Sequence, residues 1–186
     1  MMRSTMTTKM REPATLPRHD NEHDETGNIN DAMRGRASAG VIHALDQALA
    51  LANQAVLRCK WQYGAALRYH SPQFAAAALG HANEARIHAG RIVDRITALG
   101  GEPEPFTGAD SMRQHGAHRH GKSLAEIIAA ELAEARYTIQ GYRKIAAWLA
   151  EEDEGSAAMM EGIAAGEETC ASELNDVLAE QPEHAQ

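Results

Sequence analysis

The sequence predicts an all-α protein, a four-helix bundle in which two antiparallel helical hairpins are joined by one long crossover. Aromatic residues make up only 4% of the 186 residues, and alanine is the commonest residue. This composition disfavours a β-sandwich, whose strands are rich in Val, Ile, Thr, Tyr and Phe. Apolar residues also recur at steps of three and four along four long segments, as they do in amphipathic helices.

Two helices are predicted in the first half of the chain, after a polar arm. Residues 1–36 show no sustained period, and we interpret them as a disordered arm. A first helix begins at Ala37, and the pair Ser71-Pro72 supplies an N-cap and an N-terminal proline for a second helix that ends at Gly100. The predicted inward stripe of the first helix contains Val41, Leu45, Leu49, Ala52, Val56, Cys59 and Tyr63.

Two more helices are predicted in the second half. Ser123 opens the third helix, and Glu126 three residues later completes a capping box. We expect Gly155-Ser156 to break the chain and to start a fourth helix that ends before Pro182. The predicted bundle therefore spans residues 37–180, and residues 181–186 form a tail.

The connections between the helices determine the topology. The outer two are a few residues long, so each predicts an antiparallel hairpin. The middle connection, residues 101–122, is long enough to cross the bundle, because about 20 extended residues reach about 65 Å and a helix of about 28 residues is about 42 Å long. One crossover between two hairpins is the ferritin-like topology of a four-helix bundle.

Charge and hydropathy narrow the class of protein further. The formal net charge is -8, which argues against a protein that binds nucleic acid over its whole surface. No apolar stretch approaches the roughly 20 residues of a membrane span, and the N-terminus lacks the apolar region of a secretory signal. Two cysteines are too few for a disulfide framework. We therefore expect a cytoplasmic protein with no membrane partner.

A few polar residues interrupt the inward stripes of the second and fourth helices, among them His81. His88, Glu167 and Cys170 should converge at the middle level of the bundle, flanked by Glu84 and Glu131. A buried carboxylate is costly unless it is paired or binds a metal. Imidazole, carboxylate and thiolate suit one iron or zinc ion. Alternatively, the histidine and the carboxylate bond to each other and the cysteine acts as a small hydrophobe.

The crossover carries a second, weaker candidate for a metal site. Its segment RQHGAHRHGK places three histidines, His115, His118 and His120, within six residues. Histidine clusters in loops bind metals. An ordinary solvated loop with glycines explains the same residues.

Three segments resemble the bacterioferritin branch of the ferritin-like superfamily. They are HANEARIHAGRIVDRITALGGEP on the second helix, ELAEARYTIQGYRKIAAWL on the third and EGIAAGEETCASELNDVLA on the fourth. The resemblance covers about residues 40–180. It implies iron storage in a hollow shell of subunits, with Fe(II) oxidised by O2 at a di-iron site in each subunit.

The di-iron ligands that the resemblance implies are largely missing. The family uses one Glu from each of two helices, which would fall at Ala52 and Ala135, and a Glu-x-x-His from each of the other two. On the second helix that motif starts with Ala85 and keeps His88. On the fourth helix it keeps Glu167 and ends in Cys170.

Carboxylates on neighbouring turns would be needed to rebuild the centre. The candidates are Glu84, Glu131 and Glu134. A one-residue offset turns a side chain by about 100° around the helix, so this rescue requires local distortion. Arg86 occupies the position of the family's haem-ligating methionine, and we expect no haem.

The leading hypothesis is a bacterioferritin-like iron-binding and iron-storage protein whose ferroxidase centre has lost most ligands. It would act as a shell subunit or hold a single metal ion, in a homo-oligomer or with a catalytically complete paralogue. The sequence leaves open whether any ferroxidase activity remains. The alternative is a non-enzymatic DNA-protecting or scaffold assembly. Its DNA contacts would come from the basic N-terminal arm, which carries Arg3, Lys9, Arg11 and Arg18.

Overall fold

The computed structural model describes residues 24–106 and 123–181, and the part of the chain that it describes contains four helices and no strand. The chain divides into two units, Met1–Gly35 and Arg36–Gln186, and the bundle belongs to the second. The predicted all-α four-helix fold is confirmed. The helices are α1 (Asp24–Arg68), α2 (Pro72–Ala98), α4 (Leu124–Glu152) and α5 (Glu154–Ala179).

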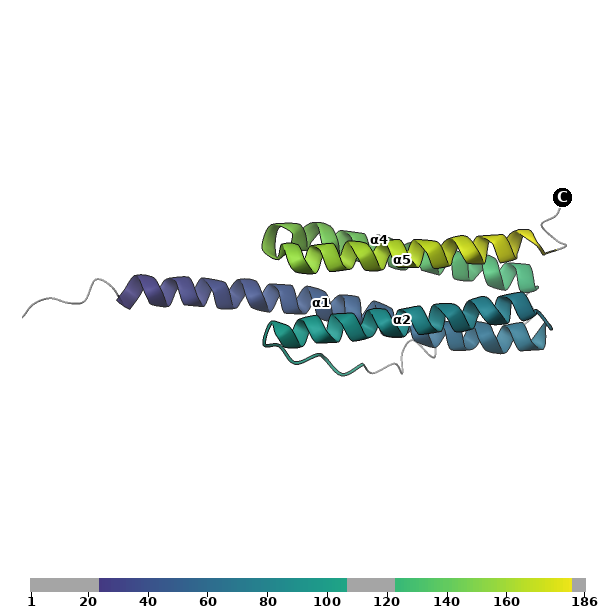
Figure 1. Ribbon diagram of the computed structural model, residues 1–186, viewed down its shortest axis with the longest axis horizontal. Helices are drawn as coiled ribbons and strands as arrows, with labels where there is room; N and C mark the ends of the chain where they lie inside the picture. The colour runs from purple at the N-terminus through teal and green to yellow at the C-terminus, as the bar shows by residue number, and fades with distance from the viewer. Residues whose placement is uncertain (1–23, 107–122, 182–186) are drawn as a thin grey trace, which may run out of the picture. The chain divides into compact units, whose positions relative to one another are not determined.

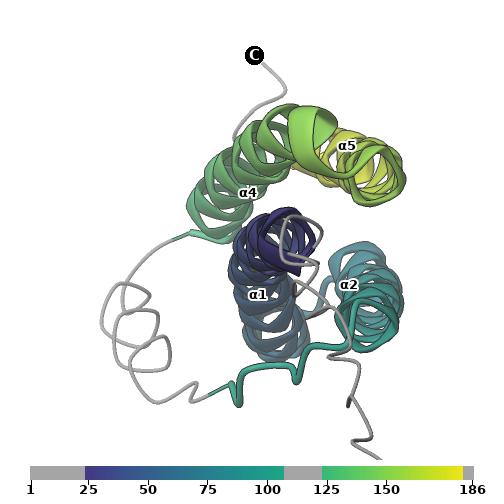
Figure 2. The same ribbon diagram turned by 90° about the vertical axis from the view of Figure 1, so that its left-hand side faces the viewer.

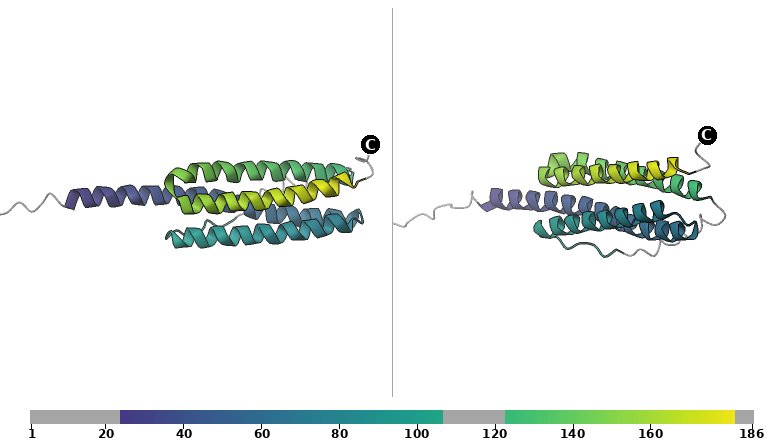
Figure 3. Two further views of the ribbon diagram at one scale, coloured as in Figure 1. Left: turned by 45° about the horizontal axis from the view of Figure 1, so that its top comes forward. Right: turned by 45° about the vertical axis from the view of Figure 1, so that its right-hand side comes forward.

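The four helices form two antiparallel hairpins, α1 with α2 and α4 with α5 (Figures 1 and 3). Seen along the bundle, each hairpin forms one of two layers that pack face to face (Figure 2). Both predicted N-caps are present. The Ser71 hydroxyl accepts a hydrogen bond from the Phe74 amide, and Ser123 and Glu126 form the complete capping box.

The break between α4 and α5 lies at Asp153, two residues before the predicted Gly155-Ser156 break. Asp153 has extended backbone angles, with φ -154° and ψ 95°, and caps both helices. Its Oδ1 accepts hydrogen bonds from the amides of Gly155 and Ser156, at 3.1 and 3.3 Å. The prediction was wrong because the carboxylate satisfies the free amides of the first turn, so Gly155 and Ser156 already belong to α5.

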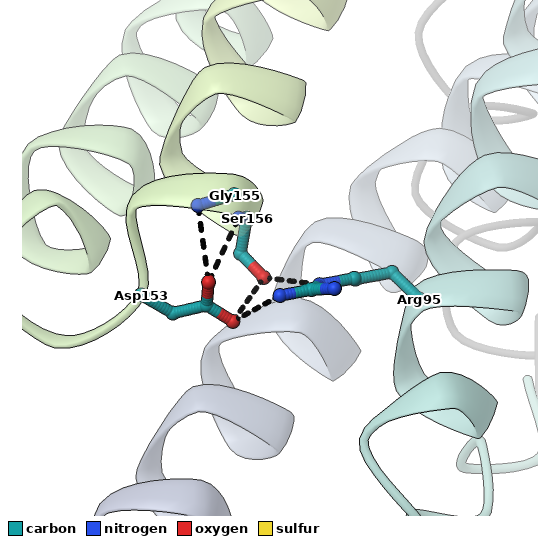
Figure 4. Close-up of polar contacts among 4 residues, drawn as sticks. All are labelled: Arg95, Asp153, Gly155 and Ser156. Atoms are coloured by element: carbon teal, nitrogen blue, oxygen red, sulfur yellow. Dashed lines mark hydrogen bonds and ion pairs between the residues drawn. The ribbon is translucent and has the colours of Figure 1, made fainter.

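Arg95 on α2 fastens this turn to the first hairpin (Figure 4). Its Nε donates to Ser156 Oγ at 2.9 Å, and its Nη2 forms an ion pair with Asp153. Ser156 Oγ in turn donates to Asp153 Oδ2 at 2.9 Å. Partial burial raises the pKa of Asp153, but the hydrogen bonds from Arg95 and Ser156 outweigh it and hold that pKa below its ordinary value. We call these three residues the end cluster.

Glycines end α2 and start the crossover, as the sequence predicts. Gly100 has a φ of 78°, and the Gly101 amide donates to the Ile96 carbonyl at 2.9 Å, which is a Schellman-type ending. A Cβ on Gly101 would lie 2.9 Å from Ile42 Cδ1, so a larger residue here would require the Ile42 side chain to shift. The rest of the crossover, including the histidine cluster of residues 115–120, lies outside the described residues.

The helix α1 begins at Asp24, before the start predicted at Ala37. Residues 24–36 contain only three apolar side chains, Ile29, Ala32 and Met33, which are too few to form the sustained apolar period on which the prediction depends. Their acidic first residues, Asp24 and Glu25, suit a helix N-terminus. The predicted disordered arm therefore overlaps the helix. Its residues 1–23 lie outside the described part, as do residues 182–186 of the predicted tail.

The core of the bundle consists of two apolar clusters with buried polar residues between them, contributed by all four helices. The first cluster includes Leu45, Ala52, Ile92, Tyr142 and Met160. The second includes Ala66, Phe74, Ile128 and Leu174. None of the helices described is long and apolar enough to cross a membrane. The intervening residues, which we call the polar layer, are Arg58, Gln62, His81, His88, Glu131, Thr138 and Glu167.

Candidate metal centre

The polar layer buries charges of both signs. Glu131 is 3% exposed, Glu167 8% and Arg58 7%. Carboxylates this deep are stable only when hydrogen bonds and opposite charge replace the water that they lose. The partners of each carboxylate therefore determine whether the layer is open to a metal ion.

His88 on α2 and Glu167 on α5 contact each other directly. His88 Nδ1 lies 3.0 Å from Glu167 Oε1, and because an ionised carboxylate only accepts, the imidazole donates from Nδ1. A Cβ at residue 166 would lie 3.1 Å from His88 Nε2, so Gly166 lets the ring pack against α5. The geometry is that of the second alternative raised by the sequence, a hydrogen-bonded pair.

Glu131 on α4 is held by α1. Its Oε2 accepts a hydrogen bond from Gln62 Nε2 at 3.0 Å. One turn earlier on α1, Arg58 Nη2 donates to Thr138 Oγ1 at 3.1 Å. Arg58, Glu131 and Glu167 line the same small cavity. The Arg58 guanidinium therefore lies on the wall of the cavity that both carboxylates also line.

The positions where the resemblance implies carboxylates carry methyl groups. Ala52 is fully buried and Ala85 is 1% exposed, while Ala135 is half-buried. Ala52 packs in the first apolar cluster. Alanine has no donor atom, so these three positions contribute nothing to a metal.

The three glutamates near the lost ligand positions, Glu84, Glu131 and Glu134, differ in whether they reach the polar layer. Glu131, one turn before Ala135, reaches into the polar layer. Glu84 and Glu134 are exposed and do not reach it. The one-residue offset from the lost ligand positions explains this, because it turns each side chain by about 100°.

Both cysteines border the polar layer as free thiols. Burial raises the pKa of Cys59 to about 12, although the charge of Arg58 opposes the shift. Burial together with the charges of Glu167, Glu173 and Glu84 raises the pKa of Cys170 to about 12. Both thiols are therefore protonated at neutral pH, and neither presents a ready thiolate.

The polar layer does not fit a di-iron centre. Within residues 24–106 and 123–181, no three His, Cys, Asp or Glu side chains are grouped so that they could hold a metal. His88 and Glu167, which the resemblance retains as ligands, are bonded to each other. Haem ligation has no support either, because Arg86 is exposed and its Nη2 donates to Asn83 Oδ1.

Sequence reasoning missed Arg58 and Gln62, the two residues that α1 contributes to the layer. The predicted stripe placed Val56 and Tyr63 inward, but both are half-buried. The inward side of α1 can be recognised from four small residues, Ala48, Ala52, Ala55 and Ala66. Continuing their spacing of three or four residues along the helix leads to positions 58–59 and 62. Long polar side chains on such a stripe are usually taken for surface residues.

The topology and the inward polar layer define a class of protein, the helical bundles with one long crossover and polar side chains at mid-height. Within that class the family is established by sequence. Residues 42–183 match the model of the ferritin-like domain. The chain belongs to the ferritin-like family.

Solved structures share the fold at low sequence identity. The bacterioferritin of Desulfovibrio desulfuricans is 22% identical, with a TM-score of 0.68 over 78% of this chain and 82% of that chain. A Mycobacterium tuberculosis bacterioferritin is 24% identical, with a TM-score of 0.62 over 79% and 92%. A dodecameric thioferritin from Bacteroides fragilis is 22% identical, with a TM-score of 0.61 over 76% and 86%. No curated protein sequence matches this chain.

Proposed function

We propose that this chain is a bacterioferritin-like iron-storage subunit that helps to form an iron-holding shell and has no di-iron ferroxidase centre of its own. The observation that carries this proposal is the polar layer, in which His88 and Glu167 bond to each other and Arg58 lines the same cavity as the two buried carboxylates. Iron would be the cargo of the assembly, and its oxidation would occur elsewhere.

The charges of the polar layer support the proposal that this chain does not oxidise iron itself. Two carboxylates and a histidine attract a divalent cation, but Arg58 already supplies positive charge in the same cavity. An incoming cation would have to displace the guanidinium from Thr138 and break the contact between His88 and Glu167. Both changes leave buried polar groups unsatisfied, which costs free energy.

The assembly would be a homo-oligomeric shell or a mixed shell with a paralogue that keeps all its ligands. The B. fragilis relative is dodecameric, which supports an oligomeric assembly for this chain. Several large apolar side chains on the described surface are available for contacts between subunits, and three of them are more than half exposed. These are Tyr137, Leu67 and Leu79, which are 69%, 56% and 55% exposed.

Co-expression with a ligand-complete paralogue tests the proposal. The products are separated by size, their subunits are identified by mass spectrometry, and iron that elutes with protein is measured after Fe(II) and air are added. We expect a closed assembly that contains this chain and retains iron supplied through the paralogue. If this chain elutes as a monomer and its fractions hold no iron, the storage role is excluded.

A DNA-protecting or scaffold role is the second candidate, and it rests on the charge of the N-terminal arm. The first 19 residues contain four basic residues, Arg3, Lys9, Arg11 and Arg18, and one acidic residue, Glu12. These residues lie outside the described part of the chain. A gel-shift assay at low and moderate salt tests this role, because phosphate contacts strengthen as salt falls. If no shift occurs even at low salt, the role is excluded.

A further inference from the structure

We propose that a groove between α1 and α4 is a binding site for a small aromatic carboxylate, whose ring packs against Tyr137 and whose carboxylate pairs with Lys144. The groove is separate from the polar layer, because none of the residues that line it belongs to that layer. The proposal goes beyond the storage function and does not depend on it, since both walls of the groove come from one chain.

The groove is a hollow open to solvent, where α1 and α4 lie side by side (Figure 2). Its volume is about 300 Å³, which is at the lower end of the roughly 300–1,000 Å³ of small-molecule sites. Two helices line it: α1 contributes Gln47 and Leu51, and α4 contributes Tyr137, Gln140, Gly141, Lys144 and Ile145. The hollow is therefore large enough for a ligand with one ring and a short chain.

Gly141 provides the space in the middle of the groove. A Cβ at this position would lie 3.0 Å from Leu51 Cδ1, so a larger residue would fill the hollow or push Leu51 aside. Leu51 and Ile145 are half-buried and supply the apolar part of the lining. Apolar surface that stays open to water in this way is stabilised when a ligand covers it.

An aromatic side chain and a cation lie on either side of this glycine. Tyr137 precedes Gly141 by four residues and Lys144 follows it by three, so the three positions share one face of α4. Tyr137 is 69% exposed, more than any other large apolar side chain in the described part of the chain. Its ring is therefore free to pack against the ring of a ligand. The positions of Tyr137 and Lys144 are about 10.5 Å apart along the helix, a span that suits a ligand with a ring at one end and a charge at the other.

The charge of the groove selects an anion. The chain has 26 acidic and 18 basic residues, but no carboxylate lines the groove, and Lys144 is the only charged residue in its lining. Within residues 24–106 and 123–181, no carboxylate forms an ion pair with Lys144. The carboxamides of Gln47 and Gln140 add neutral hydrogen-bond donors to the lining. A carboxylate is thus the complementary group for this end of the groove.

Phenylbutyrate is the probe that tests the site, and its neutral amide is the matched control ligand. The full-length protein, in the assembly in which it is purified, is titrated with each, and binding is followed by ligand-observed NMR. We expect phenylbutyrate to saturate at one molecule per subunit and to bind about threefold to fivefold more tightly than the amide, the effect of an exposed ion pair. If neither ligand binds, as in a shell that covers Tyr137, or if both bind equally, the proposal is wrong.

Matched variants identify the residues that bind each part of the ligand. Lys144→Gln should reduce the affinity for phenylbutyrate to that for the amide, and Tyr137→Ala should weaken both ligands by roughly threefold. Lys60→Gln and Trp61→Ala are the controls, because they change an exposed lysine and an exposed aromatic residue on α1 that do not line the groove. Both should bind as the native chain does, and circular dichroism checks that all four variants fold. A preference for the carboxylate that survives Lys144→Gln, or an affinity that Tyr137→Ala leaves unchanged, would overturn the assignment.

Discussion

The end cluster and the polar layer each combine an arginine, a hydroxyl and a carboxylate, but they lie at different depths in the bundle. In the end cluster, Arg95 contacts Ser156 and Asp153, and the guanidinium and carboxylate side chains are 31% and 17% exposed. In the polar layer, Arg58 contacts Thr138 and shares a cavity with Glu131. Each set contains an arginine, a hydroxyl and a carboxylate, but only the second is fully removed from water.

The difference in depth gives the two clusters different roles. At the end of the bundle, water still solvates the charges, and the carboxylate caps α5 while the arginine connects the hairpins. In the layer, the charges are almost wholly removed from water, so we expect the buried carboxylates to depend on the positive charge of Arg58 in the same cavity. The buried arginine also occupies the region that a metal ion would need. We infer that the end cluster is structural and that the polar layer replaces a metal centre.

The largest effect is expected from Arg58→Met, which keeps the length of the side chain and removes its charge. Two carboxylates then remain buried without the guanidinium, and we expect a loss of about 3–5 kcal/mol in the free energy of unfolding. Urea unfolding at neutral pH measures it. Arg95→Met is the matched control, with an expected loss of about 1 kcal/mol. Equal losses in the two variants would contradict the distinction between the clusters.

A smaller effect is expected from Asp153→Ala in the end cluster. This change removes the N-cap of α5 together with the ion pair to Arg95, and a lost N-cap costs about 0.5–2 kcal/mol. Asp153→Asn keeps a capping oxygen and removes the charge, so it should recover most of the loss. If the Asn variant is as unstable as the Ala variant, the ion pair and not the cap is the main contribution.

The smallest expected effect is the pH dependence of the stability that Asp153 contributes. The pKa of Asp153 is lowered in the folded state from its ordinary value of 3.8. Its contribution to stability is therefore fully present above about pH 4 and is lost as the pH falls through the lower, folded-state pKa. The difference in stability between the native chain and Asp153→Ala should shrink below pH 3.8. Urea unfolding between pH 2 and 6 measures it, and a difference that grows on acidification would contradict the assigned ion pair.

The sequence predicts the fold well because its signals are local. The Ser71-Pro72 cap, the Ser123–Glu126 capping box and the Gly100-Gly101 ending each act within one turn. The exceptions are also local. The largely polar segment 24–36 has no sustained apolar period, and Asp153 was overlooked beside a more conspicuous Gly-Ser pair.

The polar layer is only partly predictable because its partners lie on different helices. The helical period of apolar residues identifies His88 and Glu167 as inward residues. It does not show whether they bind each other or a metal, since that depends on Arg58 and Gln62 from α1. Those two residues were missed because the predicted inward stripe of the first helix lay one position too far along the chain. The three alanines become informative only beside the family resemblance.

The most direct test of the central claim is aerobic oxidation of Fe(II) by the purified metal-free chain alone. Iron is added at about two ions per subunit, the stoichiometry of a di-iron centre, and oxidation is followed by absorbance against a protein-free blank. We expect the rate to equal that of the blank, because His88 and Glu167 are bonded to each other and Ala52, Ala85 and Ala135 carry no donor atom. A fast phase that saturates near two irons per subunit would contradict this account and would show that a di-iron centre forms despite the three alanines.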